Sequence, residues 1–186
     1  RNAVICSKEM CFALMGISIN DTLLDIIVND MIQKTVEINN CACSAIISNP
    51  LSDYLKLADT YQKLKEGFHI RMIRKQQWQY IFLDELQYDR IMLHISEDTE
   101  VHQFIRCKLG PLVEYDRAHD TQLLETLEAL IQNHNSRKLA AESLFLHRNT
   151  MVHRINKIEE VLHCSLDDTE IMEQLEFAIK MKMYAH

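Results

Sequence analysis

Hydrophobic residues in the first 109 positions gather in short runs that alternate with stretches of helical periodicity. Four runs are rich in β-branched and aromatic residues and predict strands, at 3–6, 10–15, 42–47 and 78–83. The first two runs are close enough in sequence to form a hairpin. Four other stretches repeat apolar residues every three or four positions and predict helices, at 21–38, 51–66, 88–95 and 99–109. This part of the chain therefore predicts a small α/β domain.

After Pro111 the strand signal ends and only helical periodicity remains. Apolar stripes predict four further helices, at about 123–131, 139–144, 151–162 and 171–183. Gly110-Pro111 lies between the part with strand-like runs and the part with helical periodicity only. It predicts a domain boundary, because glycine and proline both interrupt regular structure. We therefore expect a mixed α+β chain, with an α/β domain at 1–109 and an all-α domain at 110–186.

Composition limits the class of protein. Of 186 residues, 47% are hydrophobic, 25% are charged and only three are glycine, which excludes a disordered or low-complexity chain. The six cysteines include no C-x-x-C pair, and a chain of this size needs no disulfides, so we expect a reducing, cytoplasmic location. No apolar run is long enough to span a bilayer, so no membrane partner is expected.

The net charge of −7 argues against a chain coated with basic residues for nucleic acid, but the charge is unevenly distributed. Residues 112–186 carry a net charge of −5, whereas 134–158 within them carry five basic residues against one acid. This basic segment coincides with two short predicted helices joined by a brief turn, at about 136–158, which is typical of a helix-turn-helix.

The second helix of this segment has two distinct faces. Met151, Ile155 and Ile158 fall on one side at helical spacing, and polar side chains occupy the opposite side, where they can reach base edges or phosphates. Arg154 lies beside the apolar stripe, so it either binds phosphate or forms an internal ion pair with Glu125 or Glu128. The candidate DNA-binding residues are Ser136, Arg148, Asn149, Thr150, His153, Arg154, Asn156 and Lys157.

At these residues the sequence resembles the PucR family of transcriptional regulators, which includes activators of purine catabolism and sugar-diacid use. The resemblance rests on six groups of residues: L-V-E-Y-D at 112–116, L-L-E-T-L at 123–127, Asn135 with A-A at 140–141, H-R-N-T-M at 147–151, Arg154 with I-E-E at 158–160, and L-D-D at 166–168. It implies a Fis-like helix-turn-helix domain that binds a double-stranded DNA operator as a homodimer. It also implies a small-molecule effector that acts through a region upstream of Arg1.

Two residues depart from the pattern of this family. Family members usually carry Tyr where this chain has His153, which keeps a hydrogen-bond donor but loses ring area. Fis-type turns have glycine where this chain has Phe145, so we expect the turn to be accommodated differently.

The resemblance further implies that residues 1–109 form a degenerate GGDEF-like domain, with the signature turn of that domain at Cys6–Met10. A cyclase needs glycines for nucleotide approach and carboxylates for metal, and this turn offers no glycine and one acid, Glu9. We therefore expect no enzymatic activity and no cofactor. His147 and His153 are six residues apart, which does not suit metal ligands on one helix face, so no metal site is expected.

The sequence thus favours a sequence-specific DNA-binding transcriptional regulator of a catabolic pathway, acting as a dimer. The alternative is a metabolite- or nucleotide-binding dimerisation module without direct DNA binding. The sequence has no glycine-rich phosphate loop, which counts against this alternative.

Overall fold

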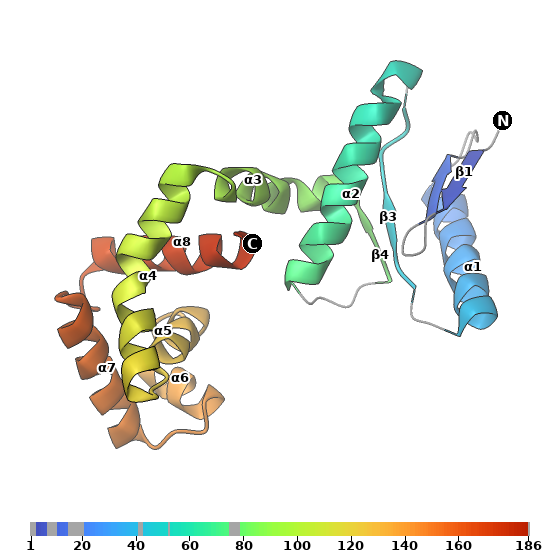
Figure 1. The fold of residues 1–186 in the computed structure, drawn as a ribbon. Coiled ribbons are helices and arrows are strands. Elements are labelled where there is room, and N and C mark those ends of the chain that lie inside the picture. Colours follow the sequence, from blue (N-terminus) through green and yellow to red (C-terminus); the bar gives the residue numbers. More distant parts are fainter. Residues whose placement is uncertain are drawn as a thin grey trace. The chain divides into compact units, whose positions relative to one another are not determined.

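The computed structural model describes residues 3–6, 11–14, 21–40, 43–51, 53–74 and 79–185. The chain divides into two compact units, one formed by residues 1–64 and 76–84 and the other by 65–75 and 85–186 (Figure 1). None of the described helices is long and apolar enough to cross a membrane.

The first unit contains two small sheets. Strands β1 (Ala3–Cys6) and β2 (Cys11–Leu14) pair antiparallel, with Ala3 opposite Leu14, which confirms the predicted hairpin. Its turn, where the GGDEF-like signature is expected, lies outside the described residues. Strands β3 (Ala45–Ile47) and β4 (Tyr80–Phe82) pair in parallel. The long helix α1 (Asp21–Asn39) connects the two sheets in sequence, and the 3-10 helix η1 (Tyr54–Lys56) follows β3.

The four predicted strands are therefore present among the described residues, but they pair only two by two. A pair of three- or four-residue strands is too small to bury a continuous sheet face. The residues of β3 and β4 remain only partly buried. This arrangement leaves the GGDEF-like fold unconfirmed, although helices and strands do alternate in this part of the chain.

Helices dominate the rest of the chain. Helix α2 (Leu57–Arg74) begins later and ends later than predicted, and the 3-10 helix η2 (Leu83–Leu86) leads into α3 (Gln87–Ser96). Five helices follow, namely α4 (Thr99–His119), α5 (Leu123–Gln132), α6 (Arg137–Ser143), α7 (Arg148–Leu162) and α8 (Thr169–Tyr184). In Figure 1, α5, α6 and α7 gather at one end of α4, and α8 lies across it.

One hydrophobic core holds α4 to α8 together. The apolar stripe predicted for α7 is fully buried at Met151, Ile155 and Ile158. Leu139 and Met183 are exceptions, because they belong to predicted stripes and are about half exposed. The other helices contribute Leu109, Leu112, Leu123, Leu127, Leu130, Ala140, Ala141, Leu175, Ala178 and Ile179 to the same cluster.

Gly110-Pro111 does not end a helix. Helix α4 continues through Pro111 to His119, so the boundary predicted at 109/110 lies inside a continuous helix of the second unit. Proline lacks an N–H for the helix ladder, and its ring crowds the Cβ of the preceding residue. Gly110 has no Cβ, and nothing lies within 4 Å of the place where one would be. The surroundings of Gly110 therefore do not require glycine, and the buried Leu109 and Leu112 on the two sides of the Gly-Pro pair hold the helix in the core.

A buried carboxylate joins three segments of the second unit. Asp89 on α3 is only 2% exposed and pairs with the Nε of Arg74 at 2.9 Å. It also accepts a hydrogen bond from the hydroxyl of Tyr184 at the end of α8. Burial and the neighbouring Asp89 carboxylate raise the pKa of Tyr184 to about 12. The charge of Asp89 is thus neutralised locally, as a buried charge requires.

Candidate nucleic-acid interface

Helices α6 and α7 form a helix-turn-helix, with the turn at residues 144–147. Two backbone hydrogen bonds close the end of α6: the Leu146 N–H donates to the Ala141 carbonyl at 2.8 Å, and the Phe145 N–H donates to the Glu142 carbonyl at 3.1 Å. This pair of bonds is the Schellman arrangement of a helix C-terminus. Ala140 and Ala141 on α6 are buried in the core, where their small side chains let α6 and α7 pack closely.

Phe145 occupies the position of this turn where glycine is usual. Its φ is 54°, in the left-handed region that costs a non-glycine residue about 1–2 kcal/mol. The expectation that the turn would be accommodated differently was therefore wrong, since the phenylalanine itself adopts the left-handed conformation. Its side chain is 97% exposed, so burial of the ring does not offset this strain.

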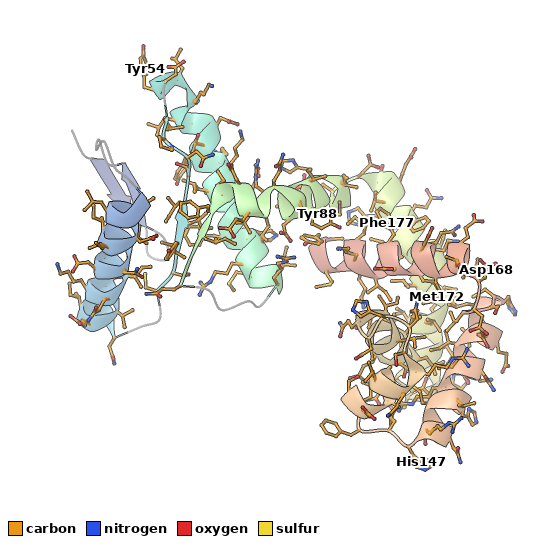
Figure 2. All side chains as sticks on the ribbon, turned by 180° about the vertical axis from the view of Figure 1, so that it is seen from behind. Tyr54, Tyr88, His147, Asp168, Met172 and Phe177 are labelled. Carbon is orange, nitrogen blue, oxygen red and sulfur yellow. The ribbon has the colours of Figure 1, made fainter. Side chains whose placement is uncertain are left out.

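Side chains cap both helices of the motif. The Ser136 Oγ accepts a hydrogen bond from the Leu139 N–H at 3.4 Å and so caps α6. The cap of α7 is His147, whose Nδ1 accepts from the Asn149 N–H at 3.2 Å. Figure 2 shows His147 at the start of α7. Both caps fix the direction of the N-terminal turn, where the backbone N–H groups favour an anion.

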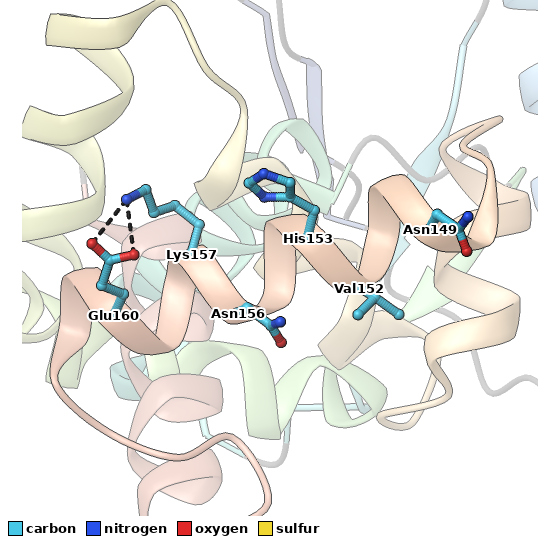
Figure 3. Close-up of a pocket in the computed structure, with 6 residues that line it drawn as sticks. All are labelled: Asn149, Val152, His153, Asn156, Lys157 and Glu160. Atoms are coloured by element: carbon cyan, nitrogen blue, oxygen red, sulfur yellow. Dashed lines mark hydrogen bonds and ion pairs between the residues drawn. The ribbon is translucent and has the colours of Figure 1, made fainter.

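The exposed side of α7 carries a continuous row of side chains that line a shallow hollow. Figure 3 shows these side chains along one helix. We call this row the α7 stripe, and it consists of Asn149, Val152, His153, Asn156, Lys157 and Glu160. The spacing of three and four residues places all six on one helix face.

Five of the predicted site residues present open side chains. Within the described part of the chain, none of these five side chains makes a hydrogen bond or ion pair, and all five are exposed: Arg148, Asn149, Thr150, His153 and Asn156. The first three lie in the first turn of α7, and the other two continue along the α7 stripe. Polar groups that lack a protein partner are available to a ligand.

Lys157 is less available than its neighbours. Its Nζ lies 2.9 Å and 2.8 Å from the two carboxylate oxygens of Glu160, and 5.4 Å from the centroid of the Tyr115 ring. The hydrogen bond that Lys157 donates to Glu160 is the main reason that the pKa of Lys157 is raised. The same bond lowers the pKa of Glu160. Lys157 must exchange this partner before it can bind a phosphate.

Arg154 points toward the protein. Its guanidinium donates to the Thr126 Oγ1 and to the Gln122 Oε1, both at 3.1 Å, and so ties α7 to the start of α5. The structure thus favours the internal alternative for Arg154, but its partners are neutral. Glu125 and Glu128 were the wrong partners, and Glu128 pairs with Lys182 at 2.9 Å instead.

Asp116 on α4 stabilises the start of α5, to which Arg154 also binds. Its carboxylate accepts hydrogen bonds from the backbone N–H groups of Leu123 at 2.8 Å and Leu124 at 2.9 Å, and from the Thr121 hydroxyl. Burial raises the pKa of Asp116, but these hydrogen bonds and the nearby Arg154 outweigh burial and lower it overall. A residue of the preceding helix therefore caps α5, whose own N-cap residue makes no side-chain cap bond.

Two further basic residues of this segment are paired with acids. Arg137 contacts Asp167 at 2.8 Å, and Lys138 lies 4.0 Å from Glu142. Only Arg148, among the five bases of this described segment, has neither an ion pair nor a hydrogen-bonded side-chain partner. The count of five basic residues therefore overstates the free positive charge of this surface.

Sequence reasoning missed three residues of this surface. Val152 and Glu160 belong to the α7 stripe, and His147 is its cap. The spacing of Val152 and Glu160 from Asn149 would have identified the first two, because steps of three and eleven residues return to one helix face. No sequence signal identifies His147, since histidine is not among the preferred N-cap residues.

Comparison with known proteins agrees with this geometry. Residues 123–181 match the model of the PucR C-terminal helix-turn-helix domain. The purine catabolism regulatory protein of Bacillus subtilis (strain 168) is 32% identical over 91 residues, which is 49% of this chain and 17% of that protein. The proline-responsive transcriptional activator PutR of the same organism is 31% identical over 133 residues, 69% of this chain and 32% of that protein. This chain thus spans less than a third of either relative, and its residues 123–181 form a helix-turn-helix domain of the PucR C-terminal type.

Proposed function

We propose that this protein is a DNA-binding transcriptional regulator in which α7 is the recognition helix. The observation that carries the proposal is the open polar face of α7, held on a helix-turn-helix that matches the PucR C-terminal model. In such motifs the second helix enters the major groove and its N-terminal residues contact base edges. Two relatives are named as regulators of purine catabolism and of the response to proline, which supports a role in controlling a catabolic pathway.

The first turn of α7 positions the protein on the duplex. Arg148 and Thr150 are exposed there at the helix N-terminus, where the helix dipole adds attraction for a phosphate. Asn149, His153 and Asn156 then face the base edges. Arg154 acts indirectly, because its hydrogen bonds to α5 fix the orientation of α7. Lys157 contacts a phosphate after releasing Glu160.

A homodimer suits this surface. One recognition helix covers only a few base pairs, and helix-turn-helix dimers reach two half-sites about 34–36 Å apart. Two copies on a palindromic operator also compensate for the acidic flanks of the domain, which weaken non-specific attraction to DNA. We propose that residues 1–109 act as a non-catalytic, degenerate GGDEF-like domain, and that a cytoplasmic small molecule controls the regulator through a further region.

Fluorescence anisotropy with duplexes selected from random DNA tests the proposal. Arg148→Ala should weaken specific binding by about 1–3 kcal/mol, because it removes one base or phosphate contact. Arg106→Ala is the matched control, since Arg106 is an exposed basic residue on α4 outside the helix-turn-helix. Failure to select any duplex, or equal losses in the two variants, would contradict the proposal.

A further inference from the structure

We propose that the α7 stripe reads A·T base pairs, with Asn149 and Asn156 binding adenine and Val152 contacting a thymine methyl group. This inference rests on the proposed function and narrows it to a class of operator. Two observations lead to it. Some side chains of the α7 stripe are exposed and have no partner among the described residues, whereas Lys157 and Glu160 are paired with each other.

The N-terminal part of the stripe contains no Arg or Lys. The basic residue Lys157 lies near the C-terminal end of the stripe. It follows Asn149, Val152, His153 and Asn156 along the helix. Guanine is read most often by Arg or Lys, which donate two hydrogen bonds to its O6 and N7. Arg148 is the first residue of α7 and lies outside the stripe, at the helix N-terminus, where the helix dipole favours a phosphate.

The bonds of Lys157 strengthen this assignment. Both oxygens of Glu160 accept from its Nζ, and the Nζ lies 5.4 Å from the centroid of the Tyr115 ring, so the ammonium already has partners on two sides in the free protein. The same pairing occupies Glu160, which would otherwise be an acceptor for the amino group of cytosine. Both stripe residues that could read a G·C pair through charge are thus bonded to each other.

The open residues match A·T pairs. An Asn amide can accept from the adenine N6 amino group and donate to N7 at the same time. Asn149 and Asn156 have exposed amides with no side-chain partner among the described residues, and their spacing of seven puts them two turns apart on one face. Val152 lies between them with 40% of its surface exposed, although valine has no polar group to present. In the major groove the natural contact of such a side chain is the C5 methyl group of thymine.

Base analogues test each contact separately in the full chain. A half-site is first selected from random duplex DNA with the wild-type protein, and we expect A·T pairs at its core. Replacing the critical thymine by uracil removes only the methyl group and should weaken wild-type binding about threefold to fivefold. Replacing the critical adenine by 7-deazaadenine removes N7 and should weaken binding about tenfold.

The variants assign these losses to residues. Val152→Ala should show a smaller difference in affinity between thymine and uracil sites than the wild type, because alanine keeps only one methyl group. Asn149→Ala should bind adenine and 7-deazaadenine equally at the position that Asn149 contacts. Ile91→Ala is the matched control, because Ile91 is an exposed apolar residue of α3, and it should keep both discriminations. Alanine is the best helix former, so these exposed replacements leave α7 intact.

The outcomes separate this inference from the proposed function. A selected half-site with a G·C core, or unchanged thymine–uracil discrimination in Val152→Ala, overturns the A·T assignment while DNA binding stands. Selection of no duplex at all overturns the proposed function and this inference with it.

Discussion

The left-handed backbone conformation of Phe145 predicts that removal of this large apolar side chain raises the free energy of unfolding, whereas such removals usually lower it. A φ of 54° costs a non-glycine residue about 1–2 kcal/mol, and Phe145→Gly removes that strain. Glycine adds about 0.4–1 kcal/mol of entropy to the unfolded chain, which opposes the gain. The ring is 97% exposed, so its loss removes almost no burial. The expected net effect is a stabilisation of about 0.5–1 kcal/mol.

Thermal unfolding followed by circular dichroism measures this effect. The midpoint should rise by about 1–4 °C, because each kcal/mol moves it by about 2–4 °C in a chain of this size. Glu176→Gly is the matched control, since Glu176 is exposed within α8 and glycine in a helix interior destabilises by about 0.5–1 kcal/mol. Phe145→Ala keeps the strained conformation and should leave the midpoint unchanged. If Phe145→Gly lowered the midpoint as Glu176→Gly does, the reasoning from φ would be refuted.

Three further predictions concern bonds that support the domain. Asp116→Asn should lower the free energy of unfolding by about 1 kcal/mol at neutral pH, because it weakens the cap of α5. The lowered pKa of Asp116 means that its stabilisation is present above the ordinary value and lost as pH falls through the folded value, so urea unfolding should show a shallower acid limb in this variant. The raised pKa of Tyr184 means that stability falls as pH rises from about 10 to about 12, and Tyr184→Phe should flatten this alkaline limb. Arg154→Ala should reduce stability without changing the salt dependence of DNA binding, whereas a slope smaller by about one would identify a phosphate contact.

The parts of the fold that follow a local rule could be predicted from sequence. The core face of α7 was predicted because Met151, Ile155 and Ile158 return every three or four residues, which only a helix can bury together. A side-chain oxygen before such a pattern predicts that Asn135 or Ser136 caps α6, and Ser136 does so. Both signals lie within one turn or one helix, so no tertiary context was needed.

Features that depend on distant residues could not be predicted. The partners of Arg154 lie 28 and 32 positions away, and nothing in the local pattern favours Thr126 and Gln122 over the acids beside them. Helix α4 passes through Pro111 although proline usually ends a helix, because buried Leu109 and Leu112 anchor it to the core on both sides of the Gly-Pro pair. Packing outweighs local propensity at this point.

The acids that pair with the basic segment explain how an acidic chain can bind DNA selectively. Exposed ion pairs such as Arg137–Asp167 and Lys138–Glu142 stabilise a protein by about 0–1 kcal/mol, so a phosphate can replace the acid at little cost. Away from the operator these acids hold the bases and reduce non-specific attraction. At the operator, the proposed contacts from the α7 stripe would hold the duplex close enough for the exchange. Neutralising Asp167 and Glu142 should therefore strengthen binding to all DNA and reduce the ratio of specific to non-specific affinity, which titration against operator and random duplexes would measure.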